Sequence, residues 1–510
     1  MSDLEHTSSS VIPSNTDYAF DPQIWDLIIV GAGVAGSALA HSQGKDGRRV
    51  LLLERDLAEP DRIVGEYLQP GGVQKLEELG LGDCVAAIDA AQVQGYCIIK
   101  KGERAFLSYP DGGVAGSVTG RGFHHGRFIQ KLRQAAAAHP TVTLRQGIVK
   151  ALTDEEGRAW RGEEGVIGGV IYRTPDGEDR IARGALTVVC DGMHSCLRTH
   201  LSVPRMQQPS YFVGLILKGC QLPHKGRAHS VIARPAPVLF YPISSTEVRC
   251  MVDVPGPKLP SLMSGELQAY LRDNVAPQLP PSLQAPFLKG VEEGAIRSMQ
   301  CKVLPAAPLR RPGGLLLGDS FNMRHPITGG GMTVALSDVA LLSEILGNLP
   351  DFKDPHKTAR SIASFYWRRI PYSASINILA NSLYDMMCDR GSEGQAEIMD
   401  ACFNYLKLGQ WYSEGPVSLI GGLSPRLSTL AIHMLCMAIF GAVRLQTRWS
   451  PLRGWKLIWS ALFYAVTVYI PLVKAEALDY VSYCLRYGQR NQNQKNAPSL
   501  WHLRDHVHSI

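Results

Sequence analysis

Glycines spaced for binding a phosphate follow the first long apolar run of the sequence. The residues of this turn are Gly31, Gly33, Val34, Ala35 and Gly36. Gly31 permits a tight turn, Gly33 lets backbone N–H groups approach a pyrophosphate, and Gly36 allows a helix to pack closely on a strand. The N-terminus of that helix favours the negative charge of a phosphate. Glu54, at the end of the next apolar run, is placed to hydrogen-bond ribose hydroxyls.

Two strands and a helix must position this turn. Asp26–Val30 is apolar and β-branched, which is typical of a strand buried on both faces, and Val50–Leu53 predicts a second such strand. The intervening segment from residue 37 to 47 is helical in character. A strand, glycine turn, helix, strand and acid within about 30 residues indicate a dinucleotide-binding fold. This motif alone does not distinguish FAD from NAD.

Two later apolar runs also end at acidic residues. Leu186–Cys190 leads into Asp191, and Gly314–Gly318 leads into Asp319, which is followed by a Pro/Gly loop and a helical run. We expect Asp319 to bind ribityl and pyrophosphate hydroxyls and the loop to approach an isoalloxazine ring. The loop residues of interest are Gly330, Gly331 and Met332. The alternatives are a helix N-cap for Asp319 and an ordinary loop for the glycines.

Together these segments resemble the FAD-dependent monooxygenases related to para-hydroxybenzoate hydroxylase. Further motifs narrow the resemblance to squalene monooxygenase, also called squalene epoxidase. They are Glu54-Arg55, 60–66, 69–72, Gly95-Tyr96, 123–128 and the string NMRHPITGGGMT at 322–333. The similarity extends from residue 24 to 475, nearly the whole folded chain. The sequence looks like the shorter fungal type, without the N-terminal membrane region of animal relatives.

The resemblance implies a chemistry and a set of site residues. FAD is reduced with electrons from NADPH, and an oxygen atom from O₂ is transferred to a trisubstituted alkene. Tyr96 and Gln69 are expected to pair beside the flavin as the catalytic residues, whereas the alternative for Tyr96 is a half-buried strand tyrosine. Arg55, Arg62 and Arg127 are expected near the cofactor, whereas each alone would be interpreted as a solvated charge or a surface salt bridge.

Composition limits the remaining possibilities. The chain has 510 residues, is 45% hydrophobic and carries a formal net charge of +6. These values exclude disorder for the bulk of the chain. The sequence contains no block of basic residues, so a nucleic-acid partner is not expected. The 11 cysteines contain no CxxC motif, so no metal site or disulfide framework is predicted, and they fit a reducing compartment.

Apolar runs near the C-terminus suggest attachment to a membrane. Thr429–Val443 and Leu457–Val473 carry no formal charge, although each is marginal for a span of ~20 residues. Basic residues between them suit anionic headgroups. The alternative is a pair of buried core helices.

The predicted fold is α/β: a Rossmann-like FAD-binding domain, an interleaved mixed-sheet substrate domain and a C-terminal helical membrane-associated region. The predicted divisions are a disordered polar tail at 1–23, the FAD-binding domain at 24–205 and 300–350, the substrate-binding domain at 206–299, a helical cap at 351–425, a membrane-associated helical pair at 426–475 and a polar tail at 476–510.

The resemblance implies epoxidation of squalene to 2,3-oxidosqualene in sterol (ergosterol) synthesis. It also implies a separate NADPH–cytochrome P450 reductase as partner, because no second nucleotide-binding motif appears in the chain. The expected location is the endoplasmic reticulum membrane or the lipid droplet surface, with the catalytic domain facing the cytosol. Two alternatives remain open: a specialised paralogue that epoxidises another prenyl chain, and a non-catalytic membrane-associated flavoprotein.

Overall fold

The structure, a computed structural model, describes residues 18–110, 118–162, 165–203, 206–389, 391–448 and 450–488. Most of the predicted N-terminal tail and the last part of the predicted C-terminal tail lie outside these ranges. So does Trp449, one of the tryptophans beside the predicted helical pair.

In the first sheet, the glycine turn follows the C-terminal end of a parallel strand, β1. Its order is β8 (Val142–Gln146), β2 (Val50–Glu54), β1 (Ala19–Val30), β11 (Asp179–Val189), β10 (Gly169–Arg173) and β9 (Ile148–Thr153), with β17 (Gly314–Leu316) also paired to β11. β8, β2, β1, β11 and β17 are parallel, whereas β10 is antiparallel to both neighbours. The four predicted buried strands are therefore confirmed. β1 begins earlier than expected, because Ala19 and Phe20 also pair with β11.

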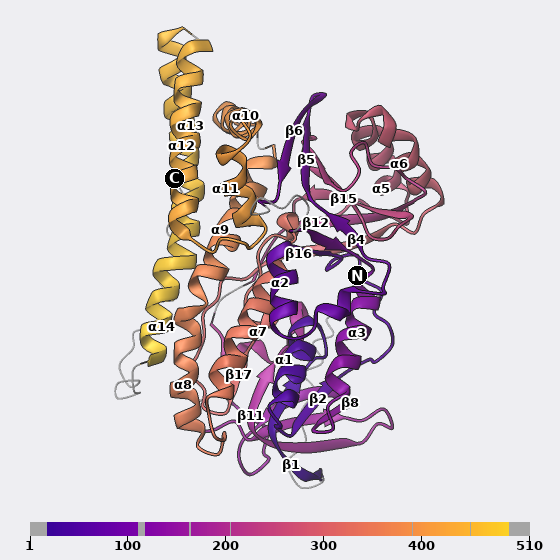
Figure 1. The fold of residues 1–510 in the computed structure, drawn as a ribbon, viewed down its shortest axis with the longest axis vertical. Helices are drawn as coiled ribbons and strands as arrows, with labels where there is room; N and C mark the ends of the chain where they lie inside the picture. Colours follow the sequence, from indigo (N-terminus) through magenta and orange to yellow (C-terminus); the bar gives the residue numbers. More distant parts are fainter. Residues whose placement is uncertain are drawn as a thin grey trace, which may run out of the picture.

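Helices cover this sheet and connect it to the rest of the molecule. They are α1 (Val34–Lys45), α2 (Pro70–Glu78), α3 (His125–Ala137), α7 (Gly331–Gly347) and α8 (Pro355–Arg368). α1 contacts both α3 and α7, and α7 contacts α2 and α8. Figure 1 shows α1, α2 and α7 between the two sheets and the long C-terminal helices. The helix predicted after the glycine loop is α7.

The second sheet forms the other large layer of the molecule. Its order is β16 (Arg297–Val303), β12 (Gln207–Lys218), β15 (Glu247–Pro255), β14 (Val238–Pro242), β13 (Ala228–Val231), β5 (Gly95–Lys100) and β6 (Glu103–Ser108). α6 (Pro281–Glu293) contacts β12, and α5 (Glu266–Tyr270) lies nearby. A small third sheet is ordered β3 (Tyr67–Leu68), β7 (Gly120–Gly122) and β4 (Ala91–Val93).

The predicted domain boundaries differ from the structure around β5 and β6. The sequence placed residues 24–205 wholly in the FAD-binding domain, but β5 pairs in parallel with β13 of the second sheet. The alternating pattern of these strands identifies them as strands without showing which sheet they join. Tyr96 is therefore carried by the second sheet, opposite the layer that carries the glycine turn.

Helices form the third part of the molecule. They are α9 (Ile370–Met387), α10 (Glu393–Lys407), α11 (Trp411–Ile420), α12 (Leu427–Arg448) and α13 (Pro451–Val473). α12 and α13 contact each other, and Figure 1 shows them along the left edge of the molecule. We call these two helices the apolar hairpin.

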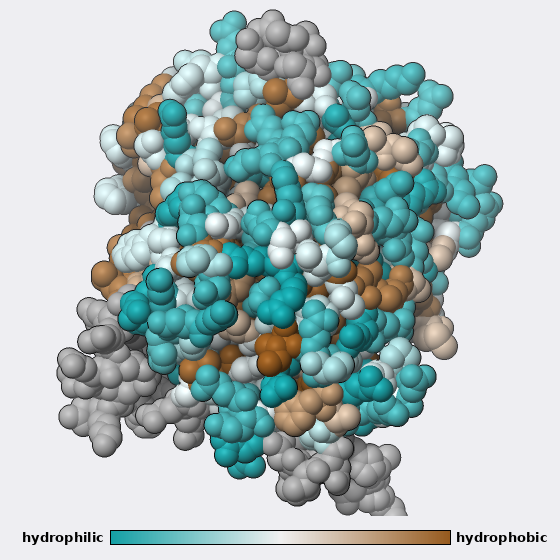
Figure 2. Space-filling model, turned by 60° about the horizontal axis from the view of Figure 1, so that its bottom comes forward, coloured by the Kyte–Doolittle hydropathy of each residue, from teal (hydrophilic) through white to brown (hydrophobic). Residues whose placement is uncertain are grey.

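Much of the apolar hairpin faces outward. Leu435 is 62% exposed, and Trp459 and Phe463 are 69% and 73% exposed. By length and composition, α12 and the segment Pro451–Leu485 are two candidate membrane spans, with 17% and 12% of their apolar windows buried. Figure 2 shows apolar residues along the left edge, on the side where the hairpin lies in Figure 1. This exposure disfavours the alternative of two buried core helices.

The predicted polar tail from residue 476 is wrong where the structure describes it. A π-helical turn, Lys474–Asp479, continues directly from α13, and α14 (Tyr480–Gly488) follows. Glu476 is 5% exposed and Tyr480 is 2% exposed. The Tyr480 hydroxyl donates to the Tyr366 carbonyl on α8 at 3.0 Å. We call Lys474–Gly488 the terminal segment. The polarity of this sequence wrongly predicted an unstructured tail, because the buried polar groups of the terminal segment have partners far away in the chain.

Polar substitution of one face of α13 tests membrane attachment. Trp459, Phe463 and Val466 lie on one helical face and are all exposed. A triple change to Gln, Ser and Thr should reduce binding to vesicles by several kcal/mol, since each large apolar group contributes ~1.5–3 kcal/mol. The measurement is flotation with liposomes.

The thermal unfolding midpoint of this triple variant should stay near that of the wild type, because the changed side chains are on the surface. Met263→Ser is the matched control, because Met263 is 98% exposed on the loop before α5. Equal flotation of the triple variant and the wild type would contradict attachment through α13.

Candidate active site

The first glycine turn depends on close backbone packing. A side chain at Gly36 would place its Cβ 1.9 Å from the Gly31 carbonyl oxygen. Gly31 has a φ of +100°, and a Cβ there would lie 2.5 Å from the Cys190 carbonyl oxygen at the end of β11. Only glycine fits both positions, so α1 begins directly above the ends of β1 and β11.

The first glycine turn lies next to Gly318, the residue that precedes Asp319. A Cβ built at Gly318, whose φ is +69°, would lie 3.2 Å from the Cβ of Ala35 in the first turn of α1. By contrast, no protein atom lies within 4 Å of a Cβ at Gly33. The backbone at Gly33 therefore faces open space at the N-terminus of α1, which fits the approach of a pyrophosphate.

Glu54 is held at the end of β2 by backbone and by an arginine. Its Oε2 accepts a hydrogen bond from the Ala32 N–H at 2.7 Å and lies 3.5 Å from Arg133 Nη2. The Arg133 side chain is 5% exposed and also donates to the Ala32 carbonyl at 3.0 Å. Sequence analysis missed Arg133. Its signal was a charged residue on the apolar face of α3, between Leu132 and Ala136.

Asp319 lies at the bottom of a hollow. Its side chain is exposed, yet surrounding protein desolvates the carboxyl and raises its pKa, while Arg324, Arg62 and Arg198 oppose that rise. A small pocket reaches from this carboxylate to the start of α7; its lining residues are Gly318, Asp319, Asn322, Arg324, Gly331, Val334, Ala335 and Asp338. The pocket itself is filled by its own lining, so a ligand would reach the carboxylate from its exposed side.

The loop that carries Gly330 and Gly331 is fitted tightly between α9 and the pocket. A Cβ at Gly330 would lie 2.5 Å from the Cγ2 of Ile376. Arg324 donates to the Gly331 carbonyl at 3.4 Å and to the Asn322 side-chain oxygen at 2.8 Å. Met332, in the first turn of α7, is buried. The loop is therefore packed against α9 at Gly330 and tied to Arg324 at Gly331.

The structure brings Gln69 and Tyr96 together, as the resemblance implied. The Gln69 amide nitrogen donates to the Tyr96 hydroxyl and to the Thr328 carbonyl, which precedes Gly329. Gln69 is fully buried at the N-terminus of α2, and Tyr96 is half-buried on β5. One amide thus joins the second sheet to the glycine loop.

Two further tyrosines complete this cluster, and sequence analysis missed both. The Tyr109 hydroxyl donates to the Gln69 side-chain oxygen at 2.6 Å and lies 2.8 Å from the Tyr67 hydroxyl. Burial raises the pKa of all three tyrosines, and most strongly those of Tyr67 and Tyr109. The hydroxyls therefore stay protonated at neutral pH and orient Gln69. A polar partner for each tyrosine could not be identified from spacing alone.

The predicted arginines do not all lie at one place. Arg55 and Arg62 are exposed, and neither makes a hydrogen bond or ion pair within the described ranges. Arg62 is close enough to Asp319 to affect its carboxyl. Arg127 is exposed on α3 and donates a hydrogen bond to the Ile88 carbonyl at 3.4 Å. The structure therefore associates Arg62 with Asp319, whereas the approach of Arg127 to a flavin stays a prediction.

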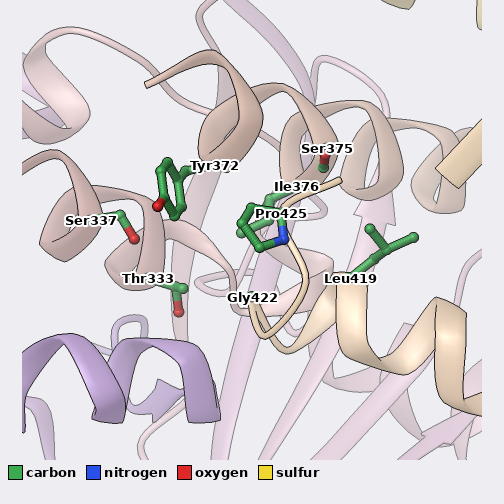
Figure 3. Close-up of a pocket in the computed structure, with 8 residues that line it drawn as sticks. All are labelled: Thr333, Ser337, Tyr372, Ser375, Ile376, Leu419, Gly422 and Pro425. Atoms are coloured by element: carbon green, nitrogen blue, oxygen red, sulfur yellow. The ribbon is translucent and has the colours of Figure 1, made fainter. Parts of the chain in front are cut away.

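A small cavity behind the glycine loop is too small to hold a substrate. Figure 3 shows that its residues come from α7, α9, α11 and the turn after α11. Its volume of about 10 Å³ suits a single water molecule.

Apolar side chains instead gather on the Tyr96 side. They form a cluster shared by β5, β6, α9, α10, α11 and α12, and its members include Tyr96, Leu107, Tyr109, Met386, Met399, Phe403, Val417 and Phe440. This cluster extends from the tyrosines to the apolar hairpin.

Side chains of types that can bind a metal meet where the second sheet contacts the loop between β17 and α7, although the sequence predicted no metal site. One ligand atom each from Asp253, Cys301 and His325 lie within 4.8 Å of one another, and all three residues are buried. The Ser210 hydroxyl lies between them, donating to Asp253 at 2.6 Å and lying 3.0 Å from His325 Nε2. This serine connects one Asp253 oxygen to His325 Nε2, whereas His325 Nδ1 is buried without a hydrogen-bond partner among the described residues.

Comparisons with known proteins identify the family. The squalene epoxidase family profile matches residues 183–459. Squalene epoxidase 1 from Arabidopsis thaliana is 50% identical over 457 residues, which cover 89% of this chain and 84% of that protein. Squalene monooxygenase SE2 from Panax ginseng is 48% identical, with coverage of 89% and 82%. The chain belongs to the squalene epoxidase family.

Solved structures agree on the fold. The p-nitrophenol 4-monooxygenase PnpA from Pseudomonas putida DLL-E4 gives a TM-score of 0.63 at 16% identity, covering 79% of this chain and 99% of that one. P. aeruginosa PqsL gives a TM-score of 0.59 at 21% identity, covering 72% and 98%. The predicted α/β monooxygenase fold is confirmed. The expected fungal type finds no support, because the relatives named above are plant proteins.

The two glycines of the first turn should respond differently to alanine. Gly36→Ala forces a contact with the Gly31 carbonyl and should destabilise the protein by about 1–3 kcal/mol, the usual range for overpacking. Gly33→Ala meets open space and should leave the unfolding midpoint of the apo-protein unchanged while weakening dinucleotide binding. Thermal unfolding of apo-protein and titration with FAD measure the two effects. Tight FAD binding by folded Gly33→Ala would show that this turn does not hold the pyrophosphate.

Proposed function

We propose that this protein is an FAD-dependent squalene epoxidase. The reaction converts squalene, O₂, NADPH and a proton into 2,3-oxidosqualene, water and NADP⁺. The observation that carries the proposal is the Gln69 amide, which joins the Tyr96 hydroxyl to the Thr328 carbonyl at the glycine loop. The names of relatives about half identical to this chain supply the substrate class.

The residues present fit FAD. The open backbone at Gly33 and the hollow at Asp319 are adjacent, because Ala35 and Gly318 are in contact range. Gly33 and the first turn of α1 would hold the pyrophosphate, Glu54 the ribose, and Asp319 the hydroxyls of the extended chain. Gly330, Gly331 and Met332 would lie against the ring. The chemistry that FAD supplies when bound is the activation of O₂ for transfer to an alkene.

The protein contributes position and the exclusion of water. An alkene has no proton to remove, so no catalytic base is needed, and none of the histidines of the described chain is assigned that role. Tyr96 presents an apolar ring toward the cluster on β6 and α10 while its hydroxyl is held by Gln69. The protonated Tyr67 and Tyr109 hydroxyls fix Gln69 in one orientation. The reacting alkene is thereby confined to the boundary between the apolar cluster and the glycine loop.

The setting proposed for this reaction is the endoplasmic reticulum membrane. A hydrocarbon substrate dissolves in lipid, and the apolar hairpin contacts the same cluster that lies beside Tyr96. Electrons are proposed to come from NADPH through a separate reductase, and the product would enter sterol synthesis. Ergosterol is not part of the proposal, because the named relatives are plant proteins.

Product identification with purified full-length protein tests the function. The protein is incubated with squalene, FAD, NADPH and O₂, with and without NADPH–cytochrome P450 reductase, and products are identified by mass spectrometry. We expect 2,3-oxidosqualene only when the reductase is present. Heat-denatured protein with active reductase is the control.

Other products would change the assignment. Absence of oxidosqualene with oxidation of another prenyl chain would indicate a specialised paralogue. Absence of any oxygenated product from flavin-loaded protein would indicate a non-catalytic flavoprotein.

Tyr96→Phe separates a catalytic role from packing. Loss of one hydrogen bond in a sheet would cost ~1 kcal/mol of stability and leave turnover nearly intact. If Tyr96 positions the alkene, a displacement of about 1 Å should lower the rate by on the order of 100-fold while FAD stays bound. The measurement is oxidosqualene formed per NADPH consumed, normalised to bound flavin.

Tyr241→Phe is the matched control for this change. The Tyr241 ring packs on Tyr67 at 5.6 Å, and no hydrogen bond joins its hydroxyl to the cluster of described residues. Its activity should match the wild type. Unchanged coupling in Tyr96→Phe would return that residue to a packing role.

A further inference from the structure

The first turn of the terminal segment belongs to a buried polar network that reaches the loop between β17 and α7. Glu476 is enclosed at the end of the apolar hairpin, and its carboxylate accepts from the Asn377 amide of α9 at 2.7 Å. The same Asn377 nitrogen donates to the Asn322 side-chain oxygen at 2.9 Å. One amide group thus bridges the terminal segment to the loop between β17 and α7.

Charge balance gives this bridge a physical role. The network encloses two guanidinium groups, Arg324 and Arg369, and two carboxylates, Asp338 and Glu476, so the formal charges cancel. Asp338 is engaged by Arg369 through two hydrogen bonds of 2.9 Å. Among the buried carboxylates, Glu476 is therefore the one left to balance Arg324, which the exposed Asp319 also attracts. A buried charge without a balancing partner is strongly unfavourable.

Arg324 connects this buried network to the pocket at Asp319. It holds the Asn322 side chain at 2.8 Å and the Gly331 carbonyl at 3.4 Å, and it lines the same pocket as Asp319. Asp319 acts on Arg324 more strongly than Glu476 does, and loss of the carboxylate at 476 would remove the second anion that acts on this guanidinium. The guanidinium would then be drawn toward Asp319 and would compete with the hydroxyls of a cofactor.

We propose that Glu476 is a positioning residue of the cofactor site, acting through Asn377 and Arg324, so that docking of the terminal segment is required for tight FAD binding. The membrane-attached hairpin and the flavin loop are thereby mechanically connected. The inference rests on the proposed binding of FAD.

Glu476→Gln tests the charge without changing the shape. Its side-chain oxygen still accepts from Asn377, so the fold should be kept, whereas the balance for Arg324 is lost. We expect the FAD dissociation constant of full-length protein in detergent to rise about tenfold, within the range typical of coupled sites. The measurement is quenching of flavin fluorescence on titration into apo-protein, with circular dichroism to confirm folding.

Two control variants exclude a general effect of the terminal segment. Asp479→Asn removes a carboxylate from the same π-helical turn and should bind FAD like the wild type. Glu476→Asp keeps the charge and should restore most of the affinity.

A double-mutant cycle identifies the pathway. In an Arg324→Gln background, Glu476→Gln should cause no further loss of FAD affinity, because its charge has nothing left to balance. An equal loss in both backgrounds would overturn the inference and assign Glu476 a general structural role. Unchanged binding by Glu476→Gln in the wild-type background would also overturn it.

A third variant covers the case in which Glu476→Gln does not fold. Asn377→Ala cuts the same bridge from α9 and should weaken FAD binding to a similar extent, and normal binding by this variant would overturn the inference. If wild-type protein itself does not bind FAD, the proposed function fails, which is a separate outcome.

Discussion

The side-chain oxygen of Asn322 is the point on which the cofactor loop depends. It accepts hydrogen bonds from Arg324 at 2.8 Å, Asn377 at 2.9 Å and Arg369 at 3.3 Å, and its amide nitrogen donates to the Leu304 carbonyl at 2.9 Å. The loop between β17 and α7 contains only short 3₁₀ turns, so no repeating backbone ladder fixes it. Side chains must do so, and they come from segments far away in the sequence. The loop after Asp319 is therefore held in part by α9, which lies far from it in the sequence.

Buried ion pairs make the two layers act as one unit. Arg369 and Asp338 join α9 to α7 through a pair that is almost fully buried, and Glu66 and Arg249 join the strand before Gln69 to the second sheet with hydrogen bonds of 2.6 and 2.7 Å. Burial raises the pKa of Glu66, and the Arg249 charge opposes that rise. Breaking such a pair by removing one partner costs about 3–5 kcal/mol. The tyrosine cluster and the glycine loop consequently keep a fixed separation, which a reaction between a ring and an alkene requires.

The sequence revealed those parts of the site whose constraints are local. The turn at Gly31 and the strand ends are prescribed by residues close together in the chain, and the structure matches them. Tyr109, Arg133 and Glu476 were missed because their roles come from partners that lie 40, 101 and 99 residues away. The membership of β5 in the second sheet was missed for the same reason, since an alternating pattern does not name its neighbour. Local chemistry is readable from spacing, but electrostatic balance is a property of the assembled fold.

The arrangement also explains how a substrate without polar groups can be oriented. The apolar cluster between β6, α10 and α12 offers contact along its whole length but no point of recognition, because hydrocarbon contacts are non-directional. The orientation of the substrate must therefore be set by the place where the apolar cluster ends. At one end of the cluster is Tyr96, and Gln69 ties its hydroxyl to the Thr328 carbonyl before Gly329. Under the proposed function, a chain that enters from the side of the apolar hairpin would advance until its end meets this boundary.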